Sequence, residues 1–225
     1  MMNDITFIIH TFKRPEQSQR LLDSIHKFYP DAKTLVYDDS EHDKGVSWGR
    51  NHLVSRVQTD YFLLLEDDFI FTERTNIEKL KTRILKGYDV VAGCLTTNGV
   101  KSHYEGVYDL TEGVLTYVAK TEEPYEFVFN FFLGRTETFR TVKWDEELKI
   151  GEHTAFFFEH RGKLKISYVG EVEVEHKQVK TPEYLKYRNR AWKFLDVFLK
   201  KYNLKEIRTF DGTVAYKLGD YKTLK

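Results

Sequence analysis

The sequence predicts a single α/β domain in which helices flank a mostly parallel central sheet. Apolar stretches at residues 5–10, 34–37, 61–65 and 90–95 alternate with helical patterns through the first hundred positions. This alternation is typical of βαβ units, because a helix that crosses between two strands makes them parallel. The chain has 225 residues, of which 41% are hydrophobic, and this suffices to bury the core of one domain.

Helices are expected between these strands. The first begins near Pro15, a residue that suits an initial helical turn, and ends before Tyr29. Residues 45–48 are expected to form a loop, and residues 51–57 a short helix with its apolar side chains directed inward. A further helix is expected at residues 76–86.

The pattern changes in the middle of the chain. Residues 104–118 and 127–133 have the character of strands with no helix between them. We expect this smaller antiparallel segment to cover the open edge of the sheet. A helix at residues 152–161 and strands at residues 164–169 and 172–175 complete the predicted core.

The C-terminal segment differs in charge from the rest of the chain. Residues 180–225 contain 12 Lys and Arg against 5 Asp and Glu, although the whole chain has 35 of each sign. Residues 184–202 predict a helix, and Asp211-Gly212 predicts a hairpin turn. The helix is expected to dock through a stripe formed by Leu185, Arg188, Trp192, Leu195 and Leu199. We therefore divide the chain into a core, residues 1–179, and a basic helix and hairpin, residues 180–225, packed on it.

Composition excludes several classes of protein. The balanced charge argues against a purely electrostatic nucleic-acid coat and against a polybasic membrane anchor. The single cysteine, Cys94, excludes an internal disulfide, and no apolar run reaches the roughly 18 residues of a transmembrane helix. Because the chain enters a strand pattern at once, without the features of a signal peptide, we expect a cytoplasmic location.

Polar side chains follow three successive strands, at residues 10–15, at residues 38–40 and at Glu66-Asp67-Asp68. Ligands of open α/β sheets bind at the carboxyl ends of the strands, so these side chains are candidates for one site. Three adjacent carboxylates at the end of a dry strand repel one another, and a divalent cation relieves that repulsion. Mn²⁺ and Mg²⁺ both accept oxygen ligands and leave positions free for phosphate oxygens.

Several motifs together give the chain a family resemblance. They are Tyr37-Asp38-Asp39-Ser40, Gly49-Arg50-Asn51, Leu65-Glu66-Asp67-Asp68-Phe69-Ile70-Phe71-Thr72 and Asn130-Phe131-Phe132-Leu133-Gly134-Arg135. In their order and spacing, over about residues 5–176, the chain resembles the ganglioside-type β-1,4-N-acetylgalactosaminyltransferases. More loosely, it resembles the family-2 glycosyltransferases of GT-A fold.

The resemblance implies a Rossmann-like GT-A core with a donor half at about residues 1–95 and an acceptor half at about residues 96–179. It also implies an inverting enzyme that uses a divalent metal. Such an enzyme moves a sugar from a nucleotide-sugar donor, a UDP-sugar, to a hydroxyl group of a glycan or another acceptor.

The resemblance assigns the nucleotide to residues at the first two strand ends. Asp39, preceded by Asp38, would hydrogen-bond the nucleobase. Thr11 and Arg14 would flank the base, and Arg50 would meet the nucleotide.

The resemblance assigns the metal to the third strand end. Asp68 would bind it directly, while Glu66 departs from the commoner aspartate and would act through ribose or water, with Asp67 between them at the donor site. His176 stands where these enzymes add a histidine ligand, although a histidine after a strand is in general a surface residue.

The base that removes the acceptor proton has three candidates. Glu152 comes first, since Gly151-Glu152-His153 resembles the family's acidic motif at the start of a helix. The family's usual acidic residue before the paired aromatics is Ala155 here, so His153 and the nearby Asp145 remain alternatives, and Glu152 could instead cap the helix.

Four aromatic residues could stack on sugar faces, although core packing is the commoner role of such rings: Trp48, Tyr104, Tyr108 and Trp144.

Other classes of protein remain open. A phage or viral glycosyltransferase could act on a modified base in DNA, held by the basic segment at residues 180–225. A non-enzymatic carbohydrate- or nucleic-acid-binding module is the second alternative, and a metal-dependent nuclease or phosphatase could also cluster carboxylates. The sequence carries no Gly-rich phosphate loop of either common form.

Overall fold

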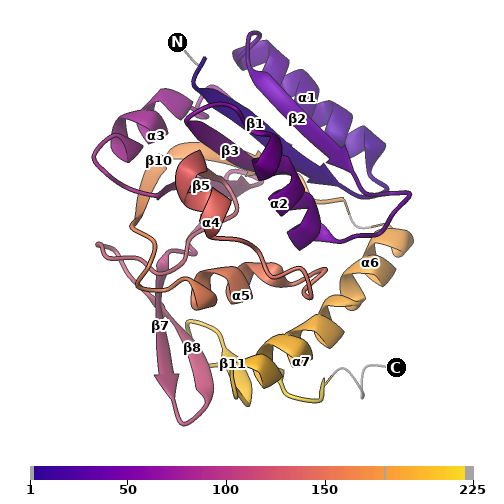
Figure 1. Ribbon diagram of the computed structural model, residues 1–225, viewed down its shortest axis with the longest axis vertical. Helices are drawn as coiled ribbons and strands as arrows, with labels where there is room; N and C mark the ends of the chain where they lie inside the picture. The colour runs from indigo at the N-terminus through magenta and orange to yellow at the C-terminus, as the bar shows by residue number, and fades with distance from the viewer. Residues whose placement is uncertain (1–2, 180, 221–225) are drawn as a thin grey trace.

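A computed structural model describes residues 3–179 and 181–220 (Figure 1). Its central sheet has the order β2-β1-β3-β9-β5-β10-β4, and β6 pairs with β5. β1 lies parallel to β2 and β3, and β5 lies parallel to β10, whereas β9 is antiparallel to both of its neighbours. The strands are β1 Ile5–Thr11, β2 Lys33–Asp38, β3 Tyr61–Glu66, β4 Phe69–Ile70, β5 Val90–Thr97, β6 Val100–Ser102, β9 Phe132–Arg135 and β10 Ile166–His176.

Helices cover both faces of this sheet. The core on one face contains side chains of α1 and α3, and the core on the other face contains side chains of α2, α4, α5 and α7 (Figure 1). In β1 the alternation places Phe7 on the first face and Ile8 on the second, since successive strand side chains point in opposite directions. The helices are α1 Pro15–Phe28, α2 Val46–Arg56, α3 Ile77–Ile84, α4 Thr136–Thr141, α5 Glu152–Glu159, α6 Pro182–Asn189 and α7 Ala191–Lys201.

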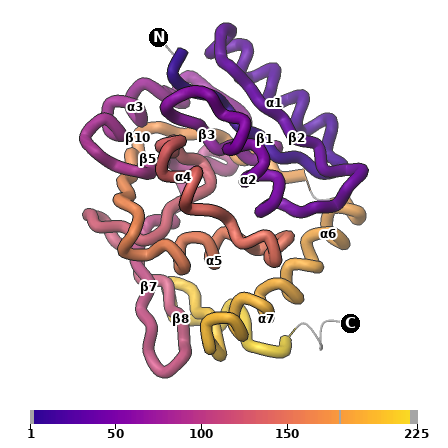
Figure 2. The backbone as a smooth tube through the Cα atoms, viewed as in Figure 1, coloured from indigo at the N-terminus to yellow at the C-terminus, as the bar shows by residue number. Residues whose placement is uncertain are grey.

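A second sheet joins the middle of the chain to its C-terminal segment. Its order is β12-β11-β8-β7, formed by β7 Gly106–Thr111, β8 Val114–Ala119, β11 Glu206–Arg208 and β12 Val214–Lys217. The β7–β8 hairpin turns at Glu112-Gly113, which both have positive φ, as a tight hairpin turn requires. Figure 2 shows how the chain leaves β10, runs through α6 and α7 past α5, and returns to this sheet.

The predicted α/β class is confirmed, and three details of the prediction are wrong. Residues 132–135 do not cover the sheet edge but insert as β9 between β3 and β5. Their neighbour in sequence, residues 106–119, leaves the sheet altogether and builds the second one. Strand order depends on which edges find partners in the folded chain, and hydrophobic periodicity does not contain that information.

The third difference concerns element boundaries. α2 begins at Val46, because Gly45 adopts φ 99° against Lys149, where a Cβ would lie 2.6 Å from the Lys149 Cα. The two strands expected at residues 164–169 and 172–175 are one strand, β10, with a register shift between Tyr168 and Glu173. The expected helix at 184–202 is two helices that meet at Arg190. Within the described residues, no helix has the length and apolar character needed to cross a membrane.

Candidate active site

A cavity of about 220 Å³ opens where β1, β3 and β10 end. It is lined from β1 and the loop after it, from β3 and its acidic turn, and from the starts of α2 and α5. The lining side chains include His10, Phe12, Arg14, Arg50, Glu66, Asp67, Asp68, Asn130, Glu152, His153, His176, Tyr184, Tyr187 and Arg188. Most of the residues predicted for the site therefore meet in one place.

Arg14 holds the acidic turn after β3 together. Its guanidinium donates to Asp67 Oδ1 at 2.7 Å and to Asp68 Oδ2 at 3.0 Å, and Thr11 Oγ1 donates to the other Asp67 oxygen at 2.8 Å. Burial raises the pKa of Asp67 to about 7, although the Arg14 charge opposes this shift. Both Asp67 oxygens are thus occupied by protein donors, which makes Asp67 a structural anchor of the turn.

Glu66, Asp68 and His176 form a potential metal site. One ligand atom of each lies within 4.8 Å of the other two. His176 reaches this position because β10 pairs antiparallel with β4, with His176 opposite Phe69. Asp68 Oδ1 is buried without a hydrogen-bond partner, and a bound cation would supply one. The donor set of two carboxylates and an imidazole fits Mn²⁺ or Mg²⁺.

A hydrogen bond links the side chains of Asp68 and His176. His176 Nε2 lies 3.4 Å from Asp68 Oδ2, and the hydrogen bond to this carboxylate raises the pKa of His176 despite its burial. Burial opposes ionisation of Asp68, but His176 and Arg14 outweigh it and lower the Asp68 pKa. Because an imidazole must be neutral to bind a cation, metal binding here would displace a proton.

A second buried arginine ties the strand ends to α5. Arg50 forms an ion pair with Glu152 and lies 3.5 Å from Glu66 Oε1, which also accepts a hydrogen bond from Asn130 at 2.9 Å. Burial alone would raise the pKa of Glu152, but the Arg50 charge, together with a backbone hydrogen bond and weaker nearby charges, lowers it. Glu152 is therefore an ionised carboxylate committed to Arg50.

His153 has a defined tautomer. Its Nε2 lies 2.7 Å from the Val128 carbonyl oxygen, which can only accept, so Nε2 carries the hydrogen. Burial lowers the His153 pKa to about 4. A neutral ring with its hydrogen on Nε2 keeps an unprotonated lone pair on Nδ1.

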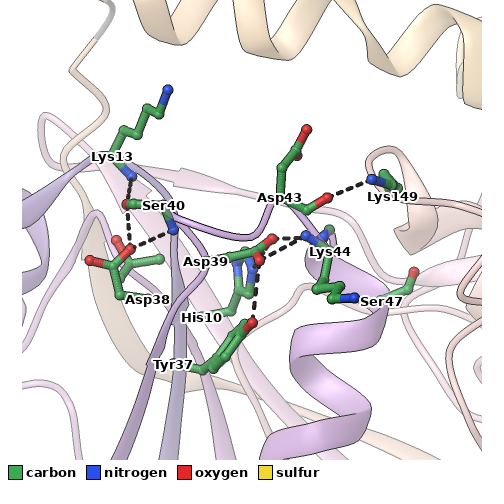
Figure 3. Close-up of polar contacts among 12 residues, drawn as sticks. His10, Lys13, Tyr37, Asp38, Asp39, Ser40, Asp43, Lys44, Ser47 and Lys149 are labelled. Atoms are coloured by element: carbon green, nitrogen blue, oxygen red, sulfur yellow. Dashed lines mark hydrogen bonds and ion pairs between the residues drawn. The ribbon is translucent and has the colours of Figure 1, made fainter.

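The strand end at Asp38 and Asp39 is closed rather than open (Figure 3). Asp39 is fully buried, and its oxygens accept from the backbone amides of Lys44 at 2.8 Å and Gly45 at 2.6 Å. Asp38 is exposed and binds the backbone amide and hydroxyl of Ser40. Neither carboxylate lines the cavity in this conformation. Through the backbone amides of Lys44 and Gly45, Asp39 holds the loop at residues 40–45 in place.

His10 belongs to the polar strand end at residues 10–15, but the sequence assigned it no individual role. Its side chain is 7% exposed, lines the cavity, and lies 3.7 Å from Asp39 Oδ2, while its Nε2 has no hydrogen-bond partner. The ring fits because residue 49 is glycine; a Cβ at that position would overlap His10 Cδ2. The spacing of the Gly49-Arg50 motif is the only sequence signal that could have indicated this contact.

Helix α6 supplies three further residues that sequence reasoning missed as site residues. Tyr184 lies under the Arg14 guanidinium at 4.3 Å, Tyr187 stacks on Phe12 at 4.4 Å, and Arg188 lines the cavity. The predicted docking stripe is wrong at its start, since Leu185 is exposed. The polar and aromatic side of α6 faces the site instead.

The remaining predicted residues lie away from the cavity. Asp145 pairs with Lys201 at 2.9 Å. Trp144 is buried and stacks on Phe156 at 4.6 Å, and Tyr108 packs against Phe127 in the core. Trp48 stacks on His52 at 4.8 Å and contacts Tyr37 of β2 at 5.2 Å. None of Trp48, Tyr108 and Trp144 lines the cavity.

A family model described as "Glycosyl transferase family 2" matches residues 13–162, about two thirds of the chain. The chain belongs to this family. The matched range includes the acidic turn, Arg50 and the start of α5, and it ends before His176 and α6.

Sequence relatives of this family 2 chain are sugar transferases. It is 33% identical over 211 residues to β-1,4 N-acetylgalactosaminyltransferase 2 of Mus musculus, a match that covers 80% of the chain and 40% of the relative. It is 30% identical over 212 residues to β-1,4 N-acetylgalactosaminyltransferase 1 of Rattus norvegicus, covering 79% and 40%. The chain thus spans about 40% of the length of these relatives.

Solved structures of similar fold include S. aureus TarS 1-349, with a TM-score of 0.59 and 11% identity over 98% of this chain and 69% of that one. The mannosyltransferase PcManGT of Pyrobaculum calidifontis, in complex with GDP-Man and Mn²⁺, has a TM-score of 0.57 and 9% identity over 89% and 64%. At these identities the likeness shows the fold alone. Together with the family match it confirms the GT-A fold and the resemblance inferred from the motifs.

Proposed function

We propose that this family 2 chain transfers a sugar from a UDP-sugar to a hydroxyl group, with inversion, using Mn²⁺ or Mg²⁺ at Glu66, Asp68 and His176. The observation that carries the proposal is this triad, with the buried Asp68 Oδ1 lacking a partner at a cavity lined by three arginines. Support comes from TarS, which has been solved with UDP-GlcNAc, and from PcManGT, solved with GDP-Man and Mn²⁺. The curated relatives are named for transfer of N-acetylgalactosamine.

The chain's own residues have separate tasks in this proposal. Glu66, Asp68 and His176 would hold the cation, and Arg14 keeps the acidic turn in place through Asp67 and Asp68. A divalent cation held there would supply positive charge to balance the diphosphate leaving group. Asp39 fixes the loop beside which the nucleobase would lie, and Arg50 links the donor side to α5.

The geometry favours one of the three candidates for the catalytic base. Inversion needs a group that takes the acceptor proton as the hydroxyl attacks the sugar from the side opposite the diphosphate. His153 lines the cavity and has an unprotonated Nδ1, whereas Glu152 is paired with Arg50 and Asp145 with Lys201. We therefore assign the base to His153 and a positioning role to Glu152.

Nucleotide binding tests the donor and metal assignments. UDP with Mn²⁺ should raise the melting temperature of the wild-type chain, corresponding to about 2.7 kcal/mol at a hundredfold excess over Kd. Asp68→Asn should abolish the shift and turnover but keep the fold. Asp38→Asn is the matched control, because this carboxylate is exposed and outside the cavity, and it should keep both. No shift with any nucleotide would refute the donor site, and an equal shift without metal would refute the metal site.

Transfer rates test the base. His153→Gln should bind UDP normally and transfer about 10²- to 10⁴-fold more slowly. Asp145→Asn should transfer at the wild-type rate, since Asp145 lies outside the cavity. Glu152→Gln should affect donor binding and transfer together, because it breaks the Arg50 ion pair. Undiminished transfer by His153→Gln would move the base back to Glu152.

The acceptor is left open between a glycan and another hydroxyl compound. DNA with a modified base is not favoured, since the relatives and solved structures named here carry no nucleic acid in their descriptions. Transfer assays with glycans and with DNA in parallel would decide the point. If the UDP-sugar is consumed with neither glycans nor DNA as acceptor, but the chain still binds sugar, a non-enzymatic binding module is supported.

A further inference from the structure

A second cavity of about 170 Å³ adjoins the first. Glu66, Asn130 and His153 line both cavities, so the two meet along this shared wall. The far wall of the second cavity is apolar and consists of Leu95, Tyr104 and Phe129. From the first cavity to the second, the lining therefore changes from charged side chains to aromatic rings. His153, the residue assigned as the base, lies at this boundary.

The aromatic wall is fixed in position. Tyr104 and Phe129 stack with ring centroids 5.3 Å apart and an interplanar angle of 30°. The backbone amide of Tyr104 donates to the buried Glu105 carboxylate at 2.8 Å, and Phe127 packs against the Tyr104 ring at 5.2 Å. A half-buried ring held in this way offers an apolar platform without reorganisation.

The charge of the second cavity limits what can enter. Among the described residues that line it, Glu66 is the one carboxylate and none is Lys or Arg. His153 is neutral at pH 7, because burial lowers its pKa to about 4. The first cavity, by contrast, contains Arg14, Arg50 and Arg188. An anionic group would therefore find no Lys or Arg counter-charge among the residues that line the second cavity.

We infer that the second cavity is the acceptor subsite and that it takes an uncharged pyranose, whose C–H face packs against the aromatic wall formed by Tyr104 and Phe129. The inference rests on the proposed function. At the shared wall the acceptor hydroxyl would face His153 and the donor sugar. The sugar C1–O bond to the diphosphate breaks with its electron pair on the UDP oxygen, a C1–O bond forms to the acceptor oxygen, and the hydroxyl proton passes to His153.

Saturation-transfer NMR with simple glycosides tests the inference on the whole chain with UDP and Mn²⁺ present. The probes are the methyl β-glycosides of glucose, galactose and N-acetylglucosamine, each of the first two paired with its uronide, which differs only in a C6 carboxylate. Neutral glycosides should receive saturation, strongest on one ring face, and the uronides should not. Tyr104→Ala should weaken neutral glycoside binding roughly tenfold, whereas Tyr104→Phe, which keeps the ring, should retain it.

The outcomes separate this inference from the proposed function. If UDP and Mn²⁺ do not stabilise the wild-type chain, the proposed function fails. If they do, but the neutral glycosides receive no saturation, or the uronides bind equally well, the inference alone fails. Weaker UDP-sugar binding by Tyr104→Ala with unchanged glycoside binding would also overturn it, since the cavity would then hold the donor sugar. Phe129→Leu provides the same test should Tyr104→Ala not fold.

Discussion

The two adjoining cavities are built on different principles. The first is lined by carboxylates and arginines that pair with one another, such as Arg14 with Asp67 and Asp68, and Arg50 with Glu152. The second is lined by stacked rings, and Glu66 is the one carboxylate among the described residues that line it. Charges removed from water need partners within the protein, whereas an aromatic wall needs only support from behind.

This difference predicts where stability and function share residues. In the first cavity a side chain that prepares the site also neutralises a buried neighbour, so its removal should cost stability as well as activity. In the second cavity a ring can be trimmed without leaving a charge unpaired. Substitutions should therefore affect the two cavities in different proportions.

Removal of Arg14 should have the largest effect on stability. Arg14→Met would leave Asp67 and Asp68 as adjacent buried carboxylates without their counter-charge, at a cost of about 3–5 kcal/mol in the free energy of unfolding. Urea denaturation measures it. Mn²⁺ should restore part of the loss, because a cation at Asp68 replaces some of the missing positive charge.

Arg74→Met is the matched control for this substitution. Arg74 also pairs with a carboxylate, Glu173, but its own side chain is 71% exposed, so the change should be at most about 1 kcal/mol. Equal losses in the two variants would contradict the view that burial of the ion pairs distinguishes the first cavity.

The sequence predicted the parts of the site that follow from strand periodicity. Thr11, Glu66 and Asp68 lie where the ends of apolar strands placed them, because parallel strands bring their carboxyl ends to one edge. His176 was expected as a ligand from its family position, but its approach to Asp68 depends on the pairing of β4 with β10. No local pattern encodes that pairing, since β4 has only two residues.

Other parts of the site arise from long-range packing and could not be predicted. Whether Tyr184, Tyr187 and Arg188 line the cavity depends on where α6 packs in the folded chain. The sequence of α6 does not reveal this position, because a helix without buried residues has little hydrophobic periodicity. Asp39 was expected to face a nucleobase, whereas the backbone of the 40–45 loop folds over it. Loop backbone donors are not visible in side-chain patterns.

Substitution of Gly49 should have the next largest effect. In Gly49→Ala the new methyl group would overlap the buried His10 ring, and the required shift should cost about 1–3 kcal/mol despite the better helix propensity of alanine. Thermal or urea unfolding measures it. In the double variant His10→Ala/Gly49→Ala the added loss from Gly49→Ala should disappear. A loss that persists there would mean that the methyl group meets another obstacle.

Acid stability tests the closed loop at Asp39. Burial opposes ionisation of Asp39, but His10 and the amides of Gly45 and Lys44 lower its pKa from 3.8 to about 2. A carboxyl with a lowered folded-state pKa stabilises the fold above its unfolded pKa, and this contribution is lost as the pH falls from about 4 to about 2. It amounts to about 2 kcal/mol.

Unfolding free energies of wild type and Asp39→Asn should therefore differ most near neutral pH and converge toward pH 2. Tyr37→Phe removes only the 3.3 Å hydrogen bond from the Tyr37 hydroxyl to Asp39, and should keep the wild-type acid profile. If the difference between wild type and Asp39→Asn is the same at pH 6 and pH 2, Asp39 does not ionise against these donors.

Replacing an aromatic ring of the second cavity with a smaller side chain should have the smallest effect on the free energy of unfolding. Phe129→Leu removes part of a half-buried ring and leaves no charge or polar atom unpaired, so we expect a loss of about 1 kcal/mol. The thermal shift with UDP and Mn²⁺ should stay as in the wild type, because Phe129 does not line the first cavity. Binding of neutral methyl glycosides should nevertheless weaken. A loss comparable with that of Arg14→Met would mean that the aromatic wall is as tightly coupled to the fold as the ionic one, and the contrast between the cavities would not hold.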